Sequence, residues 1–118
     1  MPCKDRSALT VIIPKHCLRA NAGVCALVAD VQVALFYLPD EEPQLYALGN
    51  WDPLGKANVL SRGIVGDLDG ELVVASPLYK QHFKLRSGQC LEEPAVTVPV
   101  FQTRIEGDKV LVSLQAPR

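Results

Sequence analysis

The sequence predicts an all-β protein, an antiparallel sandwich or barrel, and three observations support this prediction. Short apolar segments rich in valine recur along the chain between turn residues. Two pairs, Asp69-Gly70 and Gly107-Asp108, mark tight hairpins. Only Lys15–Asn21 and Lys56–Arg62 are suited to helical turns, and both are short. Many short strands with little helix are typical of antiparallel sandwiches and barrels.

The first half of the chain contains two apolar segments, Gly23–Ala29 and Val31–Leu38, which only Asp30 separates. In the second segment both faces of an extended strand would be apolar, apart from Gln32. Since a surface strand alternates apolar and polar residues, we expect this strand to be covered on both sides. The polar residues from Pro39 to Pro43 end it.

Later strands follow the same rule of an apolar run between turn residues. In chain order they are Gln44–Leu48, Ile64–Leu68, Glu71–Ala75, His82–Leu85, Val100–Glu106 and Lys109–Leu114. Asp69-Gly70 has the sequence of a type I′ turn, in which both central residues take positive φ. Met1–Arg6 and Gln115–Arg118 are expected to be frayed ends.

The composition indicates one ordinary globular domain. The chain has 118 residues, and 12 Lys and Arg against 13 Asp and Glu give a net charge of −1. We expect a single domain over residues 1–118 with an ordered core at about residues 7–114. A near-neutral balance argues against nucleic-acid binding through bulk charge.

The sequence favours a cytoplasmic protein. No apolar run approaches the ~20 residues of a membrane span. The apolar stretch Ala8–Pro14 ends at Lys15 and His16, which makes it too short for a convincing signal peptide. The cysteines should then be reduced, and no C-x-x-C spacing joins them. They are Cys3, Cys17, Cys25 and Cys90.

No catalytic or metal-binding residue is predicted. The chain lacks a G-x-S-x-G motif and phosphate-binding loops, and only His16 and His82 offer an imidazole base. Asp67, Asp69 and Glu71 surround a hairpin turn, and the turn explains their spacing better than a hard-cation site does.

Two irregular loops, residues 49–55 and 76–82, each follow a predicted strand and carry a proline that prevents regular pairing. Loops on a rigid scaffold often carry function. The second loop opens a basic run, residues 76–90, which contains Lys80, Lys84 and Arg86 but no acid. This run either docks an acidic partner or is a solvated strand face.

The order of these features resembles the cluster-binding half of Rieske iron–sulfur domains. The shared landmarks are Leu60-Ser61-x-Gly63 and, in S-P-L-Y-K-Q-H-F-K-L-R-S-G, Pro77, Phe83, Leu85 and Gly88. In that family the first loop carries C-x-H and the second C-P-x-H-G. The resemblance covers nearly the whole chain and implies a Rieske-like antiparallel β-sandwich or barrel with two loop tips.

The four aligned ligand positions are all changed. They are Asn50, Asp52, Ser76 and Tyr79. A Rieske cluster takes two thiolates and two imidazoles, whereas this chain offers an amide, a carboxylate, a hydroxyl and a phenol. The resemblance therefore implies a Rieske fold that binds neither cofactor nor metal.

Three segments narrow the resemblance: residues 50–53, 57–63 and 76–83 are similar to the small subunits of bacterial assimilatory NAD(P)H nitrite reductases. The resemblance implies a noncatalytic accessory subunit in the reduction of nitrite to ammonia. Its partner would be a large subunit carrying FAD, an iron–sulfur cluster and sirohaem. The alternatives are a Rieske-type electron-transfer ferredoxin and a binding module of an oxygenase system.

The expected partner surface comprises the two loop tips and the basic strand. Its candidate residues are Asp52, Arg62, Tyr79, Lys80, His82 and Arg86. Each has an ordinary structural explanation as well. Asp52, for example, precedes Pro53 and could simply shape a turn.

Overall fold

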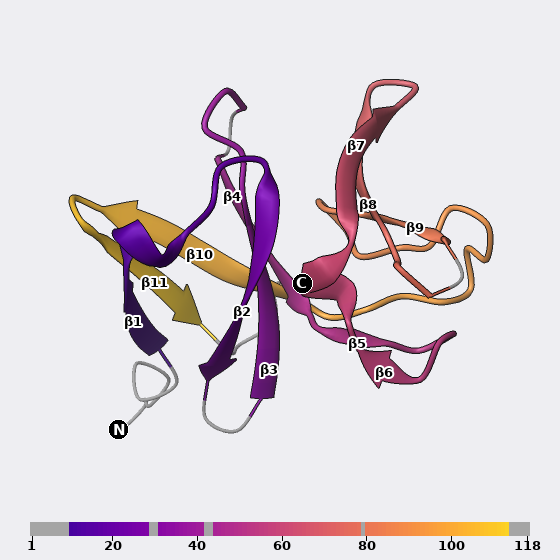
Figure 1. Ribbon diagram of the computed structural model, residues 1–118, viewed down its shortest axis with the longest axis horizontal. Helices are drawn as coiled ribbons and strands as arrows, with labels where there is room; N and C mark the ends of the chain where they lie inside the picture. The colour runs from indigo at the N-terminus through magenta and orange to yellow at the C-terminus, as the bar shows by residue number, and fades with distance from the viewer. Residues whose placement is uncertain (1–9, 29–30, 42–43, 79, 114–118) are drawn as a thin grey trace.

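A six-stranded antiparallel sheet forms the larger part of the molecule (Figure 1). The computed structural model describes residues 10–28, 31–41, 44–78 and 80–113. The strand order in the sheet is β1-β11-β10-β4-β3-β2. These strands are β1 (Thr10–Pro14), β2 (Ala22–Val28), β3 (Val31–Tyr37), β4 (Leu45–Gly49), β10 (Val100–Glu106) and β11 (Lys109–Ser113).

The chain leaves this sheet after β4 and returns to it at β10, and the excursion builds the smaller part of the molecule. A three-stranded sheet contains β7 (Ile64–Leu68), β8 (Glu71–Ala75) and β9 (His82–Lys84). A hairpin of two short strands, β5 (Trp51–Asp52) and β6 (Ala57–Asn58), lies below the three-stranded sheet in Figure 1.

The predicted all-β architecture is confirmed. The strands β7, β8 and β10 have the predicted bounds, and the others agree within one or two residues. At the turn between β7 and β8, Asp69 has φ 54° and Gly70 has φ 84°, as a type I′ turn requires. Ala29 and Leu114, the predicted ends of two strands, lie outside the described residues, as do Cys3 and both predicted frayed ends.

Three of the observed strands, β1, β5 and β6, were not predicted. β1 lies within the apolar stretch considered as a short leader, and it pairs with β11 at the edge of the sheet. β5 and β6 have two residues each, which is too few to show an alternating pattern. The two predicted helical turns are shorter than expected: they are the 3₁₀ turns η2 (Lys15–Cys17) and η3 (Leu60–Arg62). No helix in these described segments is long and apolar enough to cross a membrane.

β3 is covered on both faces, as its sequence predicts. Ala34 and Phe36 pack into one cluster of buried side chains, whereas Val33 and Leu35 pack into another. The first cluster joins the larger sheet to the three-stranded sheet through residues such as Phe83. The second lies within the larger sheet and includes β11. β3 is therefore the wall that the two cores share.

Candidate functional site

The two loop tips meet. The first is the β5–β6 hairpin, and the second is the turn Ser76–Gln81 between β8 and β9. A Cβ atom added to Gly55 of the first loop would lie 2.6 Å from Cδ1 of Leu78 in the second. The structure thus brings together two loops that the sequence singled out separately.

Asp52 ties these loops to each other from a fully buried position. Its Oδ1 accepts hydrogen bonds from the backbone N–H groups of Leu54 (2.9 Å) and Gly55 (3.1 Å). Its Oδ2 accepts one from the Ser76 hydroxyl at 2.5 Å. The prediction that Asp52 contacts a partner is therefore wrong, because its side chain has no exposed surface. Asp52 shapes the first loop and links it to the second.

Ser76 closes the second loop and is 1% exposed. Its backbone N–H donates to the carbonyl of Gln81 (2.8 Å), and its own carbonyl accepts from the N–H of Lys80 (3.0 Å). Its Oγ also accepts a hydrogen bond from the N–H of Leu78 (3.3 Å). Tyr79, in the same turn, lies outside the described residues.

Asn50 fastens the end of β4 to its surroundings and is 2% exposed. Its Oδ1 accepts a hydrogen bond from the N–H of Ser61 (2.7 Å), within η3. Its Nδ2 donates to Gln32 Oε1 (3.0 Å) and lies 3.6 Å from Cys25 Sγ. All three described residues at the aligned ligand positions are therefore buried and hydrogen-bonded within the chain.

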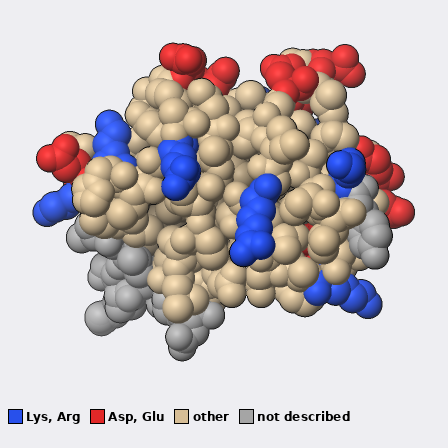
Figure 2. Space-filling view, in the orientation of Figure 1, with Lys and Arg blue, Asp and Glu red and all other residues tan. Residues whose placement is uncertain are grey.

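The basic run does not form one patch. Lys80 lies in the turn before β9, and Arg86 lies in the turn after it, so the two are at opposite ends of the strand. Arg62, in η3, is exposed as they are. On the face drawn in Figure 2, Lys and Arg side chains stand apart from one another, and Asp and Glu gather along the upper edge.

His82 is partly buried and paired with an acid from beyond the basic run. Its Nδ1 lies 2.7 Å from Glu92 Oε2, and its backbone N–H donates to Glu92 Oε1 (2.8 Å). Burial acts to raise the pKa of Glu92, but the hydrogen bonds to its carboxylate, chiefly from His82, and the electrostatic interaction with His82 together hold this pKa below its ordinary value. His82 thus anchors the segment after β9.

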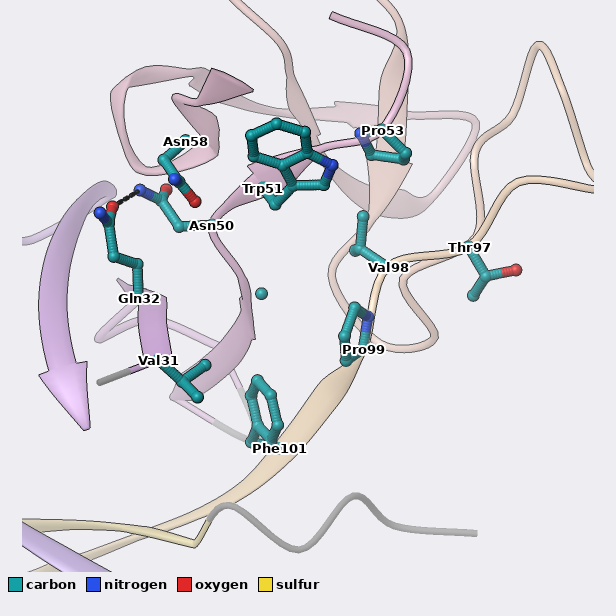
Figure 3. A pocket seen from close by; sticks show the side chains of 11 residues that line it. Val31, Gln32, Asn50, Trp51, Pro53, Asn58, Thr97, Val98, Pro99 and Phe101 are labelled. Atoms are coloured by element: carbon teal, nitrogen blue, oxygen red, sulfur yellow. Dashed lines mark hydrogen bonds between the residues drawn. The ribbon is translucent and has the colours of Figure 1, made fainter. Parts of the chain in front are cut away.

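A pocket of about 260 Å³ beside the first loop was not predicted. Its lining residues are Val31, Gln32, Gly49, Asn50, Trp51, Pro53, Asn58, Thr97, Val98, Pro99 and Phe101. Figure 3 shows Trp51 and Phe101 on opposite sides of it. The available signal was the position of Trp51, the only tryptophan of the chain, in an irregular loop.

Comparison with known proteins supports the resemblance. Residues 9–113 match the Rieske-like [2Fe-2S] domain family. The nitrite reductase (NADH) small subunit of Escherichia coli (strain K12) is 41% identical over 103 residues, which cover 87% of this chain and 89% of that protein. The chain belongs to the nitrite reductase small subunit family.

Other relatives of this small subunit family member extend the comparison. The solution structure of the nitrite reductase [NAD(P)H] small subunit from Erwinia carotovora has a TM-score of 0.71 and 40% identity, covering 91% of this chain and 82% of that one. The nitrite reductase [NAD(P)H] large subunit of Klebsiella oxytoca is 44% identical over 95 residues, which are 80% of this chain but 10% of that protein. A ferredoxin of carbazole 1,9a-dioxygenase, at 21% identity and TM-score 0.72, shares the fold.

The three described donors do not fit the iron–sulfur cluster that the wider Rieske-like family implies. An amide, a carboxylate and a hydroxyl replace the soft thiolates and imidazoles, and all three are already hydrogen-bonded. Burial raises the pKa of the neighbouring Cys25 thiol, which disfavours the thiolate that iron would need. Within the described ranges, no group of three His, Cys, Asp or Glu side chains could hold a metal ion.

Proposed function

We propose that this chain is the noncatalytic accessory subunit of an NADH-dependent assimilatory nitrite reductase and docks on the large subunit. The 41% identity to the Escherichia coli small subunit over 87% of the chain carries this proposal. The Klebsiella oxytoca relative adds support, because a domain similar to this one forms part of a large-subunit polypeptide there. The chain would act as a single domain over residues 1–118.

The reduction of nitrite to ammonia takes six electrons and therefore needs redox cofactors. We assign these to the large subunit, as FAD, an iron–sulfur cluster and sirohaem. In this chain, the donors at Asn50, Asp52 and Ser76 do not suit such a centre, and they hold the loops together instead. The small subunit would then position or stabilise its partner rather than transfer electrons.

A cytoplasmic location is part of the same proposal. Cys17, Cys25 and Cys90 are free thiols. Unpaired cysteines are typical of proteins kept in a reducing compartment.

The direct test is to co-express the tagged chain with the large subunit from the same organism. We expect the two to co-elute after affinity and size-exclusion chromatography, and the complex to reduce nitrite with NADH. Failure of the intact chain to bind the large subunit at micromolar concentrations would refute the assignment. Iron analysis of the chain purified alone distinguishes the ferredoxin alternative, which requires two iron atoms per chain.

The exposed cations of the predicted docking surface remain part of the proposal. Lys80→Glu combined with Arg86→Glu should weaken binding about tenfold if they face an acidic rim of the partner. Arg104→Glu combined with Lys109→Glu makes the same charge change on the larger sheet and serves as the control. Equal affinity for the two double variants would remove Lys80 and Arg86 from the interface. Arg62 and His82 can be tested one at a time in the same assay, and so can Tyr79.

A further inference from the structure

The pocket beside the first loop, here called the Trp51 groove, is walled by apolar side chains from separate parts of the chain. Val31 comes from the start of β3, Phe101 from β10, and Trp51 and Pro53 from the first loop. Figure 3 shows these side chains around a common hollow, with Val98 and Pro99 on its right. Trp51 is 49% exposed and Val31 is 40% exposed.

The groove is free of charge. None of its 11 lining residues is Asp, Glu, Lys or Arg, although 21% of the residues in the whole chain are charged. Its polar members are neutral. Gln32 and Asn50 hydrogen-bond to each other at 3.0 Å, and Asn58 and Thr97 lie exposed in the lining.

Hydrogen bonds join the walls of the groove to one another. Asn50 holds the base of the loop through its hydrogen bonds to Ser61 and Gln32. The N–H of Gly49 donates to the carbonyl of Pro99 (2.9 Å), which joins the end of β4 to the opposite wall. A groove already held in shape loses little conformational freedom on binding.

We propose that the Trp51 groove receives an uncharged segment of the nitrite reductase large subunit, anchored by an apolar side chain. This inference rests on the proposed function. Interface centres are depleted of charge and enriched in tryptophan, as this groove is. A charged segment would lose its hydration here without gaining a counter-ion, so the complementary occupant is neutral.

The Klebsiella oxytoca relative supports the large subunit as the partner. A region 44% identical to this chain makes up 10% of that large-subunit polypeptide, so the two components are covalently joined there. A domain joined covalently to its partner is held beside it at a high effective concentration, which favours contact between the two, and the buried centres of protein interfaces are apolar.

The experiment measures the affinity of the full chain for the purified large subunit. Trp51→Glu and Val31→Glu each place one charge in the groove, at side chains exposed enough to accept it. We expect each to raise the Kd by about tenfold or more. The matched control is Ile64→Glu on β7, where the side chain is 76% exposed and outside the groove. Its Kd should stay within about twofold of the unmodified chain.

Each outcome decides a separate point. If the unmodified chain fails to bind the large subunit, the proposed function is wrong and the groove inference falls with it. If the unmodified chain and both groove variants bind equally well, only the groove inference is overturned. The groove inference is also overturned if the control Ile64→Glu weakens binding as much as Trp51→Glu and Val31→Glu do. Analytical ultracentrifugation of the chain alone tests whether a second copy of the chain occupies the groove. Dimers that form with the unmodified chain and are lost with Trp51→Glu would refute the proposal that the groove receives a large-subunit segment.

A variant that does not fold is recognised by its thermal unfolding midpoint. Trp51→Ala then replaces Trp51→Glu, since it removes the apolar anchor without adding a charge. Its expected effect is a rise in Kd of about tenfold, with an unchanged midpoint.

Discussion

Asn50, Asp52 and Ser76 are the three most buried polar side chains that the structure describes. Burying a polar group without a partner costs free energy, and each of these has partners within the chain. The bond between Ser76 and Asp52 is the direct link between the two loops. Removal of this hydrogen bond should therefore lower the stability of the fold.

Ser76→Ala should lower the free energy of unfolding by about 1–3 kcal/mol, because Asp52 Oδ2 loses its donor while it remains buried. Chemical denaturation followed by circular dichroism measures this loss. Ser87→Ala removes a hydroxyl from an exposed turn and should change the stability by less than about 0.5 kcal/mol. Equal stabilities for the two variants would contradict the importance of the loop link.

Glu92→Gln should reduce stability at neutral pH but not in acid. Folding lowers the pKa of Glu92 from its ordinary value of 4.5, so the stabilisation is complete above that pH and is lost as the pH falls through the folded-state pKa. The Glu92 side chain is 46% exposed, so the effect should stay below about 1 kcal/mol.

Urea unfolding at a series of pH values between about 3 and 7 tests this dependence. The difference between the unmodified chain and Glu92→Gln should narrow toward acid pH. Glu93→Gln, at the exposed neighbouring position, is the control and should show little difference throughout. A difference in the free energy of unfolding that widens as the pH falls would contradict the expected direction of the pH dependence.

At the level of residues, the sequence indicated which loop positions are important, but it did not show what their side chains do. Resemblance singled out Asn50, Asp52 and Ser76, but their burial depends on how two distant loops meet. For Asp52 the structural alternative holds: it shapes the first loop from a buried position, and its sequence neighbours do not show that burial. The groove beside Trp51 could not be predicted, since it is assembled from β3, the first loop and residues 97–101.

At the level of elements, alternation and turn chemistry predicted the long strands and the Asp69-Gly70 turn. These signals are local, so they survive without knowledge of the fold. β5 and β6 could not be predicted this way, because two-residue strands are defined by their partner rather than by their own sequence. β1 could have been found, since Val11, Ile12 and Ile13 are β-branched.

Gly63 is where an element boundary depends on the absence of a side chain. It ends η3, and a Cβ added there would lie 2.3 Å from the carbonyl oxygen of Ala75 in β8. Gly63→Ala should therefore force β8 away from η3 and lower the free energy of unfolding by about 1–3 kcal/mol. Thermal unfolding of the purified variant measures this effect.

Gly66→Ala is the matched control, because a Cβ there would meet nothing within 4 Å. Its stability should be unchanged or higher by up to about 1 kcal/mol, since alanine restricts the unfolded chain. A loss of stability equal to that of Gly63→Ala would mean that close approach to β8 is not the cause.

At the level of the whole molecule, β3 makes two cores depend on each other. Leu35 and Phe36 are adjacent and fully buried, yet they belong to different clusters. Leu35→Ala should cost about 2–5 kcal/mol and Phe36→Ala about 3–5 kcal/mol. Because both residues lie in the shared strand, each variant should still unfold in one cooperative transition.

Two probes test this cooperativity. Circular dichroism follows the sheets, and the fluorescence of Trp51, the only tryptophan, follows the first loop. The two curves should coincide for the unmodified chain and for both variants. A Leu35→Ala curve that shifts by circular dichroism while the Trp51 curve stays in place would show that the two parts unfold separately.

The hydroxyl–carboxylate link between the loops has a consequence for supply in the cell. A Rieske protein completes its loop region only when the biosynthetic machinery delivers iron and sulfide. Here the corresponding join is a hydrogen bond between two side chains of the chain itself, those of Ser76 and Asp52. Since this join contains no metal, chain expressed in iron-depleted cells should reach the same stability as chain from iron-replete cells.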